Sequence, residues 1–251
     1  MSDALKKVSS SSRAMLLLAA ALVLALTHFV RWGRYVLYPF VLLTTWIHES
    51  GHGITAIILG GQFDKLEIFG DASGVATTAT IPGWRTAAVC LGGLLMPPLV
   101  GSLVLATVRG PKRAAVFLGA LTVGILFSVL MWVRSATGII AMPGLAVLFI
   151  LTLKFGNGAL RLFLSQAIAV MLALDTATRM VHYVFMEQAD GAVGGSRSDV
   201  GQISDTLGLP ITFWGVLIAG TAILMLIAGL WLAFRPVRGG APEAPAPMPK
   251  P

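Results

Sequence analysis

Apolar and polar positions follow one another along this chain in long blocks rather than in the short alternations of a soluble domain. Seven apolar stretches are separated by short polar or glycine-rich segments: 14–30, 35–60, 86–108, 114–133, 138–153, 160–186 and 211–234. A helix needs roughly 17–25 residues to cross the hydrocarbon core, and a helix satisfies its own backbone hydrogen bonds there. The pattern predicts an all-α polytopic membrane protein, a bundle of six or seven transmembrane helices.

The number of spans stays open because two stretches are irregular. The stretch 138–153 is short and contains Met142-Pro143-Gly144, which favours a kinked, re-entrant or interfacial segment. The stretch 86–108 contains Gly92-Gly93 and Pro97-Pro98, residues that break or thin a helix. Three regions follow: an N-terminal cytoplasmic segment (1–13), a transmembrane domain (14–236) and a disordered tail rich in proline and alanine (237–251).

Two segments between the apolar stretches have structural signals of their own. Residues 62–81 combine β-branched residues with a Gly-Asp-Ala-Ser-Gly turn, which predicts a short β-hairpin after the Gly60-Gly61 stop. The segment 187–210 is polar and rich in glycine. Within it, Ser198 is placed to cap a short helix that runs to Leu207 and ends at Gly208 and Pro210.

Composition and charge support a membrane location. Only 12% of the residues are charged, roughly half of the usual fraction in soluble proteins. The net charge is +7, but the basic residues lie at the ends of apolar runs, as lipid head-group contacts and topology signals do. The lipid bilayer is therefore an expected partner and nucleic acid is not. Lys6, Lys7 and Arg13 favour a cytoplasmic N-terminus, whereas the loops do not decide the orientation.

The segment His48-Glu49-Ser50-Gly51-His52 lies about halfway along the second apolar stretch. On a helix, residues four apart share a face, so His48 and His52 can offer their imidazoles to one metal ion. Glu49 stands where a general base for a metal-bound water would be needed. Such residues are costly in hydrocarbon and rarely lie there without a role. The alternative is a pair of hydrogen-bonded histidines in the core of the bundle.

A catalytic zinc usually has three protein ligands, so a third must come from another segment. Asp175 is the only acidic residue besides Glu49 deep within an apolar stretch, and a carboxylate complements two neutral imidazoles. The alternative for Asp175 is an ion pair with Arg179, four residues later. His182 is a second candidate ligand, and His28 is a weaker one near the end of the first stretch.

The motif, the following Ile57-Ile58-Leu59-Gly60-Gly61 and the hairpin with Ser73-Gly74 resemble the site-2-protease-like peptidases of clan M50, especially small M50B-like members without a PDZ domain. The resemblance is strong over 42–108 and thinner over 160–210. It implies zinc as cofactor, held by His48, His52 and Asp175, with Glu49 as the catalytic base. One departure concerns the aspartate. Family members often place it before glycine and after asparagine and proline, whereas Asp175 precedes Thr176, and Ala167 and Val170 stand at the earlier positions.

These observations predict an intramembrane zinc endopeptidase of the bacterial plasma membrane. It would use a zinc-activated water molecule to cleave a transmembrane or membrane-adjacent segment of a membrane-protein substrate. Two other functions remain open: a non-catalytic membrane scaffold or chaperone that retains the protease fold, and a metal or proton transporter. The sequence gives no indication of the substrate or the oligomeric state.

Overall fold

The computed structural model describes residues 14–20, 22–23, 26, 32–186 and 197–235. The predicted N-terminal segment and the predicted disordered tail lie outside these residues, as does most of the second half of the first apolar stretch. The described elements are α2 (Gly33–Ile58), β1 (Gln62–Ile68), β2 (Gly74–Ala79), α3 (Trp84–Thr107), α4 (Pro111–Met131), α5 (Ala136–Phe155), α6 (Gly158–Met186), α7 (Asp199–Leu207) and α8 (Ile211–Phe234).

The predicted helical membrane bundle with a hairpin is confirmed. Among the described residues, five helices are long and apolar enough to cross a bilayer, namely α3, α4, α5, α8 and the Gly158–Asp175 part of α6. The 26-residue helix α2 is not one of the five, because the polar residues of its motif interrupt its apolar run. The chain is a multi-pass membrane protein.

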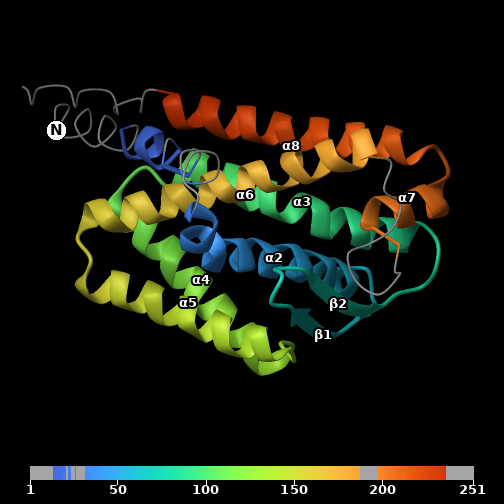
Figure 1. The fold of residues 1–251 in the computed structure, drawn as a ribbon, viewed down its shortest axis with the longest axis horizontal. Helices are drawn as coiled ribbons and strands as arrows, with labels where there is room; N and C mark the ends of the chain where they lie inside the picture. The colour runs from blue at the N-terminus through green and yellow to red at the C-terminus, as the bar shows by residue number, and fades with distance from the viewer. Residues whose placement is uncertain (1–13, 21, 24–25, 27–31, 187–196, 236–251) are drawn as a thin grey trace, which may run out of the picture.

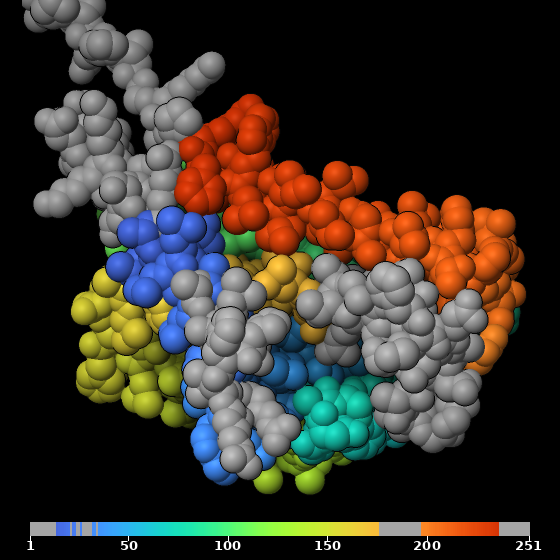
Figure 2. Space-filling model, turned by 45° about the horizontal axis from the view of Figure 1, so that its top comes forward, coloured from blue at the N-terminus to red at the C-terminus, as the bar shows by residue number. Residues whose placement is uncertain are grey.

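Helix α3 lies at the centre of the bundle and packs against α2, α6 and α8 (Figure 1). Helices α4 and α5 pack against each other as a pair. The largest core cluster joins side chains of this pair to α2 and the hairpin, with Leu66, Leu118, Ile125 and Phe149 fully buried. Helix α8 forms a ridge along one side of the molecular surface (Figure 2).

The two irregular apolar stretches form continuous helices. Helix α5 runs through Pro143 without interruption, and the hydroxyl of Ser135 accepts a hydrogen bond from the Gly138 N–H at its start. A re-entrant segment at 138–153 is therefore not observed. Helix α3 is likewise continuous through Gly92-Gly93 and Pro97-Pro98, so these residues do not break the helix.

The predicted hairpin is antiparallel and lies along α2. Its register pairs Gln62 with Ala79 and Ile68 with Gly74. Two hydroxyls of α2 hold the turn, since Tyr38 donates to the Gly70 carbonyl and Thr45 donates to the Ala72 carbonyl, each at 2.7 Å. The hairpin is thus fixed to the helix that carries the histidine motif.

The outer edge of β1 is also occupied. The Leu66 N–H donates to the Trp132 carbonyl at 2.8 Å, and the Arg134 N–H donates to the Leu66 carbonyl at 3.0 Å. The turn between α4 and α5 therefore covers β1, which leaves β2 at the border of the sheet.

The predicted short helix is α7. The Ser198 hydroxyl accepts a hydrogen bond from the Gly201 N–H at 3.1 Å, and Gly208 ends the helix with a φ of 72°, which favours glycine. This capping fixes the start of the helix at Asp199.

Candidate metal centre

His48 and His52 lie one turn apart on the same face of α2, as their spacing predicts. Both side chains are buried, and their rings meet edge to face with centroids 4.7 Å apart. The two Nε2 atoms are 3.1 Å apart. The helix therefore brings two imidazole nitrogens to one point inside the bundle.

Glycines allow α3 to approach this point closely. A methyl group built onto Gly93 would collide with the His52 ring, and one built onto Gly92 would collide with the Thr55 hydroxyl. On the other helix, a methyl group at Gly51 would meet the Gly92 carbonyl. Gly51 in the motif and the Gly92-Gly93 pair in α3 thus allow the two helices to pack closely.

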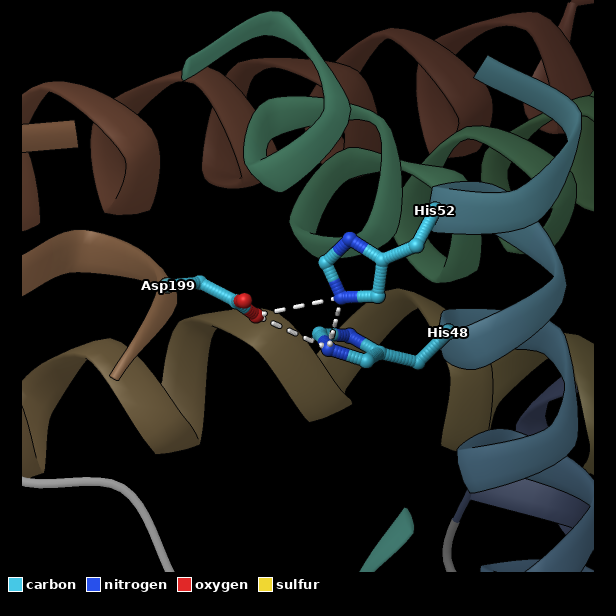
Figure 3. Close-up of side chains that lie close together, drawn as sticks. All are labelled: His48, His52 and Asp199. Carbon is cyan, nitrogen blue, oxygen red and sulfur yellow. Dashed lines mark hydrogen bonds and ion pairs between the residues drawn. The ribbon is translucent and has the colours of Figure 1, made fainter. Parts of the chain in front are cut away.

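The third member of the cluster is Asp199, the first residue of α7 (Figure 3). Its Oδ2 atom lies 3.1 Å from Nε2 of His48 and 3.3 Å from Nε2 of His52. Within the described part of the chain, these three residues form the only group of three or more potential ligands that converge on one point.

Asp175 does not belong to this cluster, so the structure replaces it with Asp199 as the third candidate ligand. The reason lies in packing. Helix α6, which carries Asp175, packs chiefly against α3 and α8, whereas α7 returns to the end of α3 that adjoins the histidines. The sequence did contain a signal, because the predicted Ser198 cap places an acidic residue in the first turn. The His182 side chain and His28 lie outside the described residues.

The hydrogen bonds of the imidazoles favour a cation between them. Nδ1 of His52 lies 2.9 Å from the Val89 carbonyl. A carbonyl only accepts, so Nδ1 carries the proton, and in the neutral ring Nε2 presents a lone pair. An ionised carboxylate is also only an acceptor, so the cluster is rich in lone pairs. Nδ1 of His48 is buried and has no hydrogen-bond partner among the described residues.

The donor set fits zinc. Two imidazole nitrogens and one carboxylate oxygen form one of the ligand sets of catalytic zinc, which keeps a further position for water. Ligand atoms at the corners of such a tetrahedron lie roughly 3.3–3.6 Å apart. The observed separations of 3.1–3.3 Å are close to this range. The three residues thus have the chemistry and the spacing of a zinc site.

The two imidazoles also act on the charge of Asp199. Burial raises its pKa, but His52 and His48, in their protonated forms, more than offset this effect by their positive charge and hydrogen bonds, so the pKa of Asp199 lies below its ordinary range. The carboxylate is consequently ionised, which is the form that binds a metal.

Glu49 adjoins the metal cluster and the hairpin together. Its side chain is buried, and the backbone of Ala76 in β2 hydrogen-bonds to its carboxylate. A methyl group built onto Gly74 would lie 2.8 Å from its Oε1 atom. The absence of a side chain at Gly74 therefore leaves room for the carboxylate between α2 and β2.

The sequence comparisons agree with this geometry. The family model described as Peptidase M50B-like matches residues 15–229, so the chain belongs to that family. The family indicates an intramembrane metalloprotease. No curated protein and no solved structure matches the chain.

Proposed function

We propose that this protein is an intramembrane zinc endopeptidase that hydrolyses a peptide bond of a membrane-protein substrate. The convergence of His48, His52 and Asp199 beside Glu49 carries the proposal. These three residues would hold zinc, which would acidify a water molecule and polarise the scissile carbonyl when bound. The membrane domain, family and composition favour the bacterial plasma membrane as its location.

The remaining steps fall to residues of the chain. Glu49 accepts the proton of the attacking water and then donates it to the leaving amine, as a general base and acid. The Ala76 backbone holds the carboxylate in place, and the Val89 carbonyl fixes the proton of His52 on Nδ1. The glycine contacts between α2 and α3 keep the site compact.

Strand β2 is the proposed contact for the substrate backbone. In the described residues β2 pairs only with β1, whose other edge is covered by residues 132–134. The Ala76 backbone turns toward Glu49, so by alternation the Thr78 N–H also lies on the edge away from β1. A substrate segment pairing there as an extended strand would expose its peptide bonds beside Glu49, whereas the amides of a helix are inaccessible.

The substitution Glu49→Gln tests the central proposal. It should retain about one zinc per chain while lowering cleavage of a model transmembrane substrate by roughly 10²–10⁴-fold, the usual contribution of a general base. The matched control is Glu67→Gln, which removes an ion pair with Lys65 in the hairpin and should leave cleavage unchanged. Undiminished cleavage by Glu49→Gln would refute the mechanism. Metal uptake by proteoliposomes that persists in this variant would indicate a transporter instead.

A proline at position 78 tests the role of β2. Thr78→Pro removes the N–H on the open edge, whereas Thr78→Ala retains it. We expect the proline variant to bind zinc normally but to cleave poorly, and the alanine variant to cleave normally. Equal activity of the two variants would remove β2 from substrate binding.

A further inference from the structure

The α4–α5 turn, residues 132–135, attaches strand β1 of the hairpin to the helical bundle (Figure 1). Two of its backbone groups bond to Leu66, in the middle of β1. The Ser135 hydroxyl adds a third bond, because it accepts from the Ile68 N–H at 2.8 Å. The same hydroxyl accepts from the Gly138 N–H in the first turn of α5. One serine side chain therefore both ends β1 and begins α5.

A second serine, Ser128, ties the α4–α5 turn to α2. Its buried hydroxyl accepts a hydrogen bond from the indole N–H of Trp46 at 2.7 Å. Its carbonyl accepts from the N–H groups of Trp132 and Val133, at 2.7 and 2.9 Å. Trp46 precedes His48 by two residues. Ser128 thus connects the start of the turn to the helix that carries the histidine motif.

An aromatic contact reinforces this connection. The ring of Phe63, in β1, stacks on Trp132 with ring centroids 4.7 Å apart. The same ring packs against Gly53 of α2, where an added methyl group would collide with it. Gly53 directly follows His52. The missing side chain at Gly53 therefore lets β1 lie close to α2.

These contacts form a closed ring that begins and ends on α2. The ring passes from Trp46 through Ser128 and the α4–α5 turn to β1. It continues across the sheet to β2 and returns from the Ala76 backbone to Glu49. Trp46 and Glu49 are three residues apart, so they are neighbours on the helix surface. A closed ring of short contacts opposes any shift of the hairpin along α2, and the α4–α5 turn thereby sets the distance from β2 to Glu49.

The metal cluster is held by other parts of the structure. Two of its members lie on α2, and Asp199 lies on α7, which packs against α3 and α8. In the described part of the chain, the hydrogen bonds of His48 and His52 run to each other, to Asp199 and to the Val89 carbonyl. A displacement of the hairpin would therefore leave the zinc ligands in place.

We propose that Ser128 and Ser135 are positioning residues for cleavage. Through the α4–α5 turn they hold β2, and with it the backbone of the substrate, at the distance from Glu49 that the reaction needs. This inference rests on the proposed function, in which the substrate pairs with β2. Neither serine belongs to the metal cluster, and both act through the hairpin. A misplacement of a bound reactant by about 1 Å can lower a rate by roughly 10²-fold.

Steady-state cleavage, normalised to bound zinc, tests the proposal. Ser128→Ala and Ser135→Ala should each lower kcat by roughly 10–100-fold with little change in KM, because the peptide still pairs with β2 but lies wrongly relative to Glu49. Ser135→Thr keeps the accepting hydroxyl and should restore kcat. The control Ser165→Ala removes a buried hydroxyl that donates to the Arg161 carbonyl of its own helix, and it should cleave normally. Equal kcat in all four variants, or a loss of cleavage explained by lost zinc, would overturn the proposal.

Hydrogen exchange supplies a readout that does not depend on proteolysis. In the two alanine variants, the amides of residues 62–79 should exchange about fivefold faster, because each variant loses a hydrogen bond of the ring that holds the hairpin. Ser135→Thr and Ser165→Ala should match the wild-type protein. Unchanged exchange in the alanine variants would contradict the positioning role. If the wild-type protein binds zinc but cleaves no substrate, the proposed function fails, and exchange alone then decides whether the two serines hold the hairpin.

Discussion

Replacing Asp199 with asparagine tests the candidate ligand that the tertiary structure adds to the motif. The substitution keeps the volume of the side chain, so the packing of α7 on α3 is retained, but it removes the anionic oxygen that lies 3.1 and 3.3 Å from the two imidazoles. A neutral amide is a much poorer zinc ligand than a carboxylate. The expected result is a specific loss of metal affinity in a folded protein.

The magnitude follows from the number of ligands. Zinc bound by protein side chains at pH 7 gains about 10–16 kcal/mol, or roughly 3–4 kcal/mol for each of the bonds that share it. Losing one bond of about 3 kcal/mol weakens binding by a factor of roughly 150. Asp199→Asn should therefore raise the zinc dissociation constant by about two orders of magnitude.

The assay is competition with a chromophoric chelator in detergent, followed by elemental analysis of the dialysed protein. Asp205→Asn is a matched control on the same helix, because Asp205 pairs with Arg197 away from the cluster. Asp175→Asn is the second comparison, since the sequence alone pointed to that residue. Wild-type affinity in Asp199→Asn together with a loss in Asp175→Asn would refute the assignment from the structure.

Three further predictions follow. Gly93→Ala should displace His52, destabilise the protein by about 1–3 kcal/mol and cause loss of zinc. The control Gly220→Ala, whose added methyl group meets open space, should retain both stability and zinc. Thermal unfolding and metal analysis would measure the two effects. The Ser73 hydroxyl and N–H donate to Asp71 and hold its pKa below its usual 3.8. These bonds therefore contribute to stability above pH 3.8, and the contribution is lost as the pH falls below that value. Ser73→Ala should raise the pKa of Asp71 toward 3.8 in an NMR titration. Zinc should leave the wild-type protein as the pH falls below about 6, because protonated imidazoles cannot bind it, and re-addition at pH 7 should restore cleavage.

Much of the architecture was predictable because hydrophobic spacing and capping are local properties. Apolar stretches of sufficient length could only form helices in lipid, which located α3, α4, α5, α6 and α8 to within a few residues. The Gly60-Gly61 stop and the β-branched run located the hairpin. The Ser198 cap located α7. The continuity of α5 was not predictable, since proline within an apolar run is compatible with either a helix or a break.

In the site, the sequence determined the histidine pair and the adjacent carboxylate, because residues four apart on one helix must share a face. His48 and His52 converge for that reason alone, and Glu49 adjoins them. The third candidate ligand depended on which distant segment packs beside the histidines. Composition does not distinguish Asp175, deep in an apolar stretch, from Asp199, at the start of a short polar helix. Only the packing of α7 against α3 brought Asp199 to the histidines.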